Sequence, residues 1–431
     1  QNQAQSYAEI TAQQIKRFIE AADENIIFSY EEVTGNALNQ SATLKKAKLK
    51  DRNYTASYLN IDEIEVKGDA SEISLVRFSD IDYVDGSERV KIGKIQGENF
   101  KTEDLKLLKS IIGMQPSNLI ERIGRLNTGA ILIENFSLDE SIKDSRTNDE
   151  IKIGEMKIDE IKNGKIEKIQ WNNVDIKIKN KASYGDLEAL KIENLSISGM
   201  DLFYLTSERN MEMGAAVGFG VSGFNLNKLS LIAGSTKEAI TLNSLQMELS
   251  DFIGELPRSN RMTLENLVIP LGPLEDAGIF PRGYVKQITD RNNLDLSMKA
   301  NLDLSTKNRE LENLLEIELK GFGKLEQKAS LSNINTNALR KLMENPNDEA
   351  AAVSLYFDSA FKSFSLTYDD EGLADHLFGL LIENFGKIYR LDNRNDLAAL
   401  AELQVRQMLS DQGQLANDAS EAVSEFIKNT K

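Results

Sequence analysis

The chain of 431 residues carries 51 basic and 68 acidic side chains, a formal net charge of −17. This charge repels phosphate backbones and anionic lipid surfaces, so the composition argues against nucleic-acid binding. The sequence has no cysteine and one histidine, His376, which excludes disulfides, thiol nucleophiles and sites built from several imidazoles. We predict no catalytic, cofactor-binding or metal-binding residue, and we interpret His376 as a surface residue.

Two features of the sequence bear on the compartment in which the protein works. No run approaches the roughly 18–20 consecutive apolar residues of a spanning helix, so we expect no transmembrane segment. The chain opens at Gln1, which favours a removed secretory leader over a trimmed terminus. The expected location is therefore periplasmic or otherwise exported.

Residues 1–25 are predicted to form an amphipathic helix, because apolar side chains recur at helical spacing through Ile10, Ile15 and Phe18. From residue 26 the pattern changes to short β runs. Residues 26–255 form a repetitive β region in which apolar positions are separated by alternating steps of three and two. Examples are Ile61-Ile64-Val66, Ile153-Met156-Ile158, Leu187-Leu190-Ile192-Leu195-Ile197, Phe224-Leu226-Leu229-Leu231 and Leu242-Leu245-Met247.

The mixed steps predict strands interrupted by bends or bulges that restore an inward apolar face. Gly93 and Gly154 fall inside such steps, where glycine suits a bulge. Two architectures fit: an elongated, twisted antiparallel sheet curled into a trough, or a parallel β-solenoid. The repeats are irregular in length, which favours the trough. The expected fold class is mainly β with terminal helices.

Four of the six prolines, together with several glycines, fall in residues 256–285, which we interpret as a connection between domains. Residues 286–370 are predicted to be an antiparallel β meander, with Val353 to Phe357 as one of its short β runs. Residues 371–431 are predicted to be C-terminal helices.

Three local motifs have competing interpretations. The acidic run from Asp80 to Gly86 resembles a calcium loop, but its spacing favours a hairpin ending in Asp-Gly. Residues 218–223 match GxGxxG, yet a strand pattern follows where a dinucleotide site needs a helix. The uncharged segment from Met213 to Phe224 is either an apolar lip that touches lipid or ligand, or a strand in which glycine permits close packing. The candidate lip residues are Val217, Phe219, Val221 and Phe224.

The helix followed by Ile27 to Gly35, the repeated Lys-Ile-Gly and Leu-Glu-Asn-Leu-type strands, and the runs Leu294 to Ser297 and Gly321 to Leu325 resemble the periplasmic AsmA-like and YdgA-like envelope proteins of Gram-negative bacteria. The resemblance implies an exported, non-catalytic protein linked to lipid movement or outer-membrane integrity. Relatives of this kind usually carry an N-terminal membrane helix, and the sequence printed here has none. The resemblance offers no motif from which functional residues could be carried over.

The function expected first is therefore binding or moving lipid, or supporting the outer membrane, with lipid or envelope proteins as partners. A candidate apolar groove would be lined by Ile153, Ile158, Ile176, Leu190 and Ile197. Two other classes stay open. One is a carbohydrate-active enzyme on a β-solenoid, and the other is a structural or interaction protein of the cell surface.

Overall fold

The computed structural model describes residues 2–22, 26–36, 38, 40–52, 57–68, 72–85, 88–101, 125–139, 149–178, 187–202, 220–233, 238–253, 256–276, 278, 283, 286, 291–305, 307–345, 347–372, 378–379, 381–382, 386, 388–408 and 413–429. The chain divides into two compact units, residues 1–257 and 258–431. The division falls at the start of the predicted connection 256–285. Much of that stretch is a regular strand, Leu256–Pro270, so it is less of a linker than its prolines and glycines indicate.

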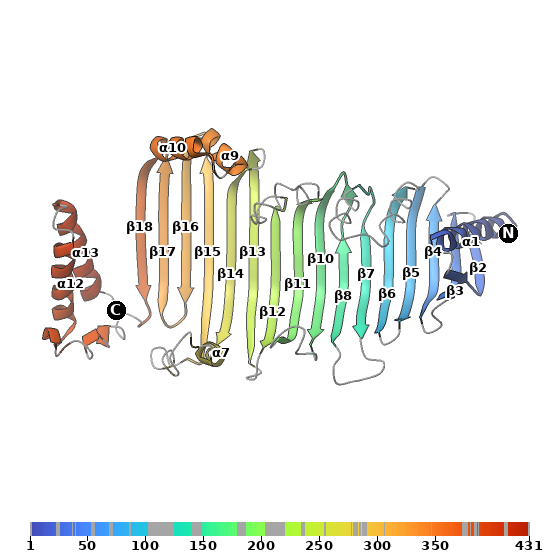
Figure 1. Ribbon diagram of the computed structural model, residues 1–431, viewed down its shortest axis with the longest axis horizontal. Helices are drawn as coiled ribbons and strands as arrows, with labels where there is room; N and C mark the ends of the chain where they lie inside the picture. Colours follow the sequence, from blue (N-terminus) through green and yellow to red (C-terminus); the bar gives the residue numbers. More distant parts are fainter. Residues whose placement is uncertain are drawn as a thin grey trace. The chain divides into compact units, whose positions relative to one another are not determined.

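Unit 1 is an antiparallel sheet whose strands lie side by side in chain order (Figure 1). It begins with the helix α1 (Asn2–Ala22), close to the predicted span 1–25. Its strands are β1 (Ile26–Ser29), β2 (Glu32–Asn36), β3 (Ser41–Asp51), β4 (Tyr58–Gly68), β5 (Glu72–Asp85), β6 (Glu88–Lys101), β7 (Ile131–Asp139), β8 (Glu150–Ile158), β9 (Ile161–Lys162), β10 (Lys165–Lys177), β11 (Leu187–Asp201), β12 (Gly223–Ala233) and β13 (Ala239–Ile253).

At two places in the sheet, two strands share one partner strand. β1 and β2 pair with opposite halves of β3, and β8 and β9 both pair with β10. All of these pairings are antiparallel, as are the others recorded among the described strands. The predicted mainly β antiparallel fold is confirmed, and the alternative parallel β-solenoid is wrong.

Unit 2 contains a second run of antiparallel strands and most of the described helices. Its elements are β14 (Leu256–Pro270), α7 (Leu271–Asp276), β15 (Asn293–Ser305), β16 (Glu310–Leu319), β17 (Gly323–Ser332), α9 (Thr336–Glu344), α10 (Glu349–Asp358), β18 (Ala360–Asp370), α12 (Arg394–Met408) and α13 (Gln414–Asn429). β14 to β18 pair in sequence order. Figure 1 shows α9 and α10 crossing the ends of these strands.

The residues from Val353 to Phe357 lie in α10, so their prediction as a β run is wrong. The side chain of Asp348 caps this helix by accepting a hydrogen bond from the Ala351 N–H at 2.9 Å. Asn335 caps α9 in the same way, accepting from the Ala338 N–H at 3.1 Å. The two helices interrupt the predicted meander between β17 and β18.

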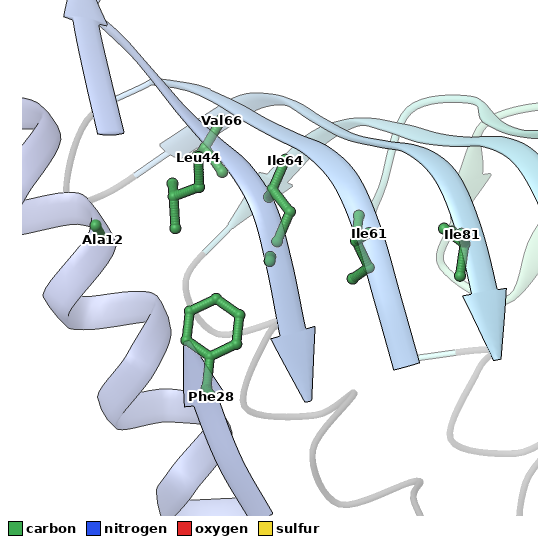
Figure 2. Packing of buried hydrophobic residues seen from close by; sticks show 8 residues of the cluster. Ala12, Phe28, Leu44, Ile61, Ile64, Val66 and Ile81 are labelled. Atoms are coloured by element: carbon green, nitrogen blue, oxygen red, sulfur yellow. The ribbon is translucent and has the colours of Figure 1, made fainter. Parts of the chain in front are cut away.

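The best-packed part of unit 1 lies where α1 covers the first strands. Ala12 of α1 and Phe28 of β1 are fully buried against Leu44 and Ile64. Figure 2 shows these side chains, with Ile61 and Val66, on the face of the sheet that α1 covers. Ile61 and Ile64 are separated by a three-residue step, so that step does keep both side chains on one face.

Candidate apolar binding face

A row of unpaired residues runs across unit 1, perpendicular to the strands. In β7 and β8, Phe136 pairs with Ile153 and Glu134 with Glu155, which leaves Asn135 and Gly154 without a ladder partner. The same gap recurs in each successive pair from β3 to β13. This unpaired row consists of Lys46, Asp62, Asp80, Gly93, Asn135, Gly154, Asn173, Glu193, Lys228 and Asn243.

Every second member of the unpaired row has a left-handed backbone. The φ angles of Lys46, Asp80, Asn135, Asn173 and Lys228 lie between 50° and 55°. Asparagine and aspartate tolerate this conformation better than other residues with a Cβ. In these five strands the left-handed residue lies within the three-residue step. The strands between them make the same step at Asp62, Gly93, Gly154, Glu193 and Asn243 without a positive φ. The predicted interruptions at Gly93 and Gly154 thus lie on the unpaired row.

Apolar side chains form a row on each side of the unpaired row, and a further row lies outside each of these. Residues directly opposite each other in antiparallel strands lie on the same face, so the pairings define these rows. The inner rows are Ile61, Ile81, Ile92, Phe136, Ile153, Val174, Ile192, Leu229 and Leu242, and Ile64, Phe78, Ile95, Ile133, Met156, Trp171, Leu195, Leu226 and Leu245.

The outer rows have the same character. They are Leu59, Tyr83, Val90, Leu138, Ile151, Ile176, Leu190, Leu231 and Ile240, and Val66, Val76, Gly97, Ile131, Ile158, Ile169, Ile197, Phe224 and Met247. At Gly97 the Phe100 ring occupies the space that a Cβ would need. We call these four rows together the apolar face.

The five candidate groove residues all lie on the apolar face. Ile153 belongs to an inner row, Ile176 and Leu190 are paired partners in one outer row, and Ile158 and Ile197 belong to the other. All five are half-buried. Ile158 packs, with Ile131 and Ile169 of the same row, against a small buried cluster made by Leu126, Ile161, Ile166 and Leu202. The helix α1 packs on the first three strands of this unit, β1, β2 and β3.

The candidate lip is only partly described. Val217 and Phe219 lie outside the described residues, as does His376. Val221 precedes β12 and is half-buried, and Phe224 lies in β12 between Ile197 and Met247. Phe224 is therefore part of the apolar face itself. Gly223 begins β12, so the GxGxxG spacing is followed by a strand and not by the helix of a dinucleotide site.

The opposite face of unit 1 is polar. Glu155 accepts a hydrogen bond from the Asn172 amide at 2.7 Å, and Asn172 accepts one from the Asn194 amide at 2.6 Å. These residues line a shallow recess of about 460 Å³ beside the unpaired row, together with Glu134 and Glu193. Glu134 forms an ion pair with Lys94. The polar groups satisfy one another and keep charge away from the apolar face.

A second recess, of about 340 Å³, lies at the ends of β3, β4 and β5 and is lined by Leu49, Leu59, Tyr83 and Asp85 among others. Burial, followed by the Asp85 carboxylate, raises the pKa of the Tyr83 phenol. Asp85 pairs with Glu88 across a two-residue connection between β5 and β6, which confirms the hairpin interpretation of the Asp80 to Gly86 run.

Within that run, the Asp82 carboxylate is bound by the Arg89 guanidinium. The guanidinium donates two hydrogen bonds to the carboxylate, at 2.8 and 2.9 Å. These hydrogen bonds hold the pKa of Asp82 below its ordinary value. In the residues that the structure describes, no group of three or more His, Asp or Glu side chains is arranged to hold a metal ion.

Comparison with known proteins adds one match. A protein-family model described as an uncharacterized protein matches residues 316–431, from within β16 to the end of the chain. No curated protein and no solved structure matches this chain. Among the described residues, no helix is long and apolar enough to span a membrane.

Proposed function

We propose that the apolar face of unit 1 binds elongated apolar molecules, and that these are the acyl chains of lipids. The observation that supports the proposal most is the continuity of four apolar rows from β6 to β13, whose members are half-buried except for the buried Gly97, Leu226 and Leu242. A sheet with one apolar face must cover that face to be stable in water. In this proposal the ligand supplies the cover that α1 supplies at the first strands.

The dimensions suit such a ligand. Neighbouring strands lie about 4.8 Å apart, so a row that crosses the strands from β4 to β13 extends roughly 40 Å. One leaflet of a bilayer is about 15 Å of hydrocarbon, so the rows are longer than a single acyl chain. Burying a methylene yields about 0.8 kcal/mol, and a palmitoyl chain half covered by the face would gain roughly 6 kcal/mol. Binding of this strength is reversible.

The charge distribution agrees with binding through apolar contact. The ion pairs of the central strands, such as Lys94–Glu134 and Lys191–Asp175, lie on the polar face. A net charge of −17 opposes docking on anionic head groups. The proposed affinity therefore depends little on salt, in contrast to electrostatic lipid binding.

The proposal agrees with the resemblance to AsmA-like and YdgA-like envelope proteins, and it places this chain among exported, non-catalytic proteins that hold or move lipid. The alternative of a carbohydrate-active enzyme assumed a parallel β-solenoid. The strands pair antiparallel, so that fold is absent from the described strands.

Native mass spectrometry of the full chain, with extraction and identification of retained lipids, tests the proposal. The wild type is expected to retain phospholipid or fatty acid. Ile176→Asp places a charge on the apolar face, and this variant is expected to lose most of the retained lipid. Asn173→Asp places the same charge on the polar face of the same strand, and this variant is expected to keep the lipid. Ile197→Asp provides a second apolar-face variant. A wild type that stays lipid-free after incubation with phospholipid contradicts the proposal.

A further inference from the structure

Unit 2 exposes an unusual concentration of large apolar side chains on two consecutive elements. Tyr356 and Phe357 at the end of α10 are 78% and 77% exposed, and Phe361 at the start of β18 is 69% exposed. Val353, Phe364 and Leu366 are also more than half exposed. We call these six residues the α10–β18 patch. Isolated exposed apolar residues are ordinary, but a cluster of this kind marks an interaction surface.

The helix α10 has apolar residues around most of its circumference, yet only Ala351 is buried in it. A helix that is apolar all round is normally enclosed by protein or lipid. The aromatic rings also contact one another: Tyr356 and Phe357 pack edge to face with centroids 5.3 Å apart, and Phe361 and Phe364 lie 6.4 Å apart. The patch thus contains two preformed aromatic pairs, one on α10 and one on β18.

The charged groups beside the patch are satisfied locally. Lys362 donates to Glu310 at 2.7 Å. Asp358 accepts hydrogen bonds from Asn335 at 3.0 Å and from Ser354 at 2.9 Å. An apolar centre rich in Tyr and Phe, with a rim of paired polar groups, has the anatomy of a protein–protein interface.

The area of the patch fits a modest dimer. Phe and Tyr bury 150–250 Å² each when fully covered, so the four rings at their present exposures offer roughly 400–700 Å². A standard interface buries about 800 Å² per partner, so this surface is smaller than standard and suits a weak, transient dimer. A homodimer with a twofold axis uses the same patch on both copies, and an apolar patch is complementary to itself.

We infer that the α10–β18 patch associates with the same patch of a second copy of this chain, forming a homodimer with a dissociation constant in the micromolar range. A bilayer surface is the less suitable occupant. Residues 349–370 contain Glu349, Asp358, Asp369 and Asp370 but one basic side chain, Lys362, and that lysine is bound to Glu310. Membrane-surface segments instead gather basic residues.

Sedimentation velocity of the full chain over a range of concentrations tests the inference. The wild type is expected to shift from a 48.2 kDa monomer to twice that mass as the concentration passes through the micromolar range. The double variant Tyr356→Ser/Phe357→Ser is expected to weaken association at least about tenfold. Met408→Ser, at an equally exposed apolar residue of α12, is the matched control and should leave association unchanged.

Phe361→Ser/Phe364→Ser tests the β18 half of the patch by the same measurement. A wild type that remains monomeric up to about 100 μM overturns the inference, because a micromolar dissociation constant predicts mostly dimer at that concentration. Dimerisation that persists unchanged in both double variants overturns it as well. So does a monomeric wild type that sediments with phosphatidylcholine vesicles and loses that binding in the double variants, because the occupant is then a membrane.

Discussion

In every second strand from β3 to β12, the residue of the unpaired row has a left-handed backbone. Asn135 and Asn173 are suited to this backbone, and a glycine leaves room beside each of them: Gly93 beside Asn135 and Gly154 beside Asn173. A Cβ on Gly154 would lie 3.0 Å from the Asn173 Cβ. The crowded contact explains why glycine occupies this position, and it allows a test at single-residue level.

Gly154→Ala is expected to destabilise the protein by about 1–2 kcal/mol, because the new methyl group overpacks against Asn173. Gly223→Ala is the control, since its Cβ would meet Ser198 at an ordinary 3.5 Å and should change stability little. Urea unfolding measures both. In the Asn173→Gly background the cost of Gly154→Ala should fall, and an undiminished cost would contradict the proposed contact.

The Asp82–Arg89 pair gives a pH-dependent prediction. The pKa of Asp82 is lowered in the folded state, so its contribution is complete above its ordinary pKa of 3.8 and is lost as the pH falls through the lower folded value. Asp82→Asn should therefore cost about 0.5–1 kcal/mol at pH 7 and progressively less below about pH 4. Thermal unfolding from pH 7 to pH 2.5 measures the difference. A cost that grows on acidification contradicts the assignment.

At the scale of elements, the sequence patterns predicted strands well and helices unevenly. The three-residue steps predicted interrupted strands. The steps given above cross the unpaired row, except Leu187 to Leu190, which coincides with a register shift between β11 and β12. α10 was mistaken for a strand because its apolar residues lack helical periodicity: Ala, Val, Leu, Tyr and Phe occur on most sides of it. The signal that could have corrected this is the cap, Asp348, followed by Glu349 and three alanines.

The contact between α1 and the first strands should dominate the stability of that end of unit 1. Phe28→Ala removes a fully buried ring from the cluster with Ala12 and Leu44, and we expect a loss of about 3–5 kcal/mol. Ile27→Ala, at the preceding position of β1, removes a side chain that is 44% exposed and should cost below about 1 kcal/mol. Equal losses in chemical unfolding would show that α1 does not pack as described.

At the scale of the whole molecule, the fold class was predictable from the sequence, while the extent of the apolar face was not. Periodicity within a strand shows which residues share a face, so Ile153 and Ile158 could be assigned together. It does not show which residues of distant strands stand opposite each other, because register depends on the connections between them. The alignment of Ile153 with Leu242, four strands apart in the sheet, therefore emerges from the pairing alone.

The exposed α10–β18 patch was missed for a different reason. Apolar residues in a sequence predict burial, and only the fold reveals which of them remain uncovered. Phe361, Phe364 and Leu366 have the alternation and composition of a core strand, yet all three are more than half exposed.

The central claim, that acyl chains bind along the apolar face, is tested most directly through Trp171. It is the single tryptophan of the chain, and it lies in an inner row between Met156 and Leu195. Fatty acids brominated on the acyl chain quench a tryptophan that they contact. We predict saturable quenching of Trp171 fluorescence that is little affected by salt and is relieved by unbrominated fatty acid. The Ile176→Asp variant should weaken it, and Asn173→Asp should not. Fluorescence that remains unquenched at saturating lipid would contradict the account.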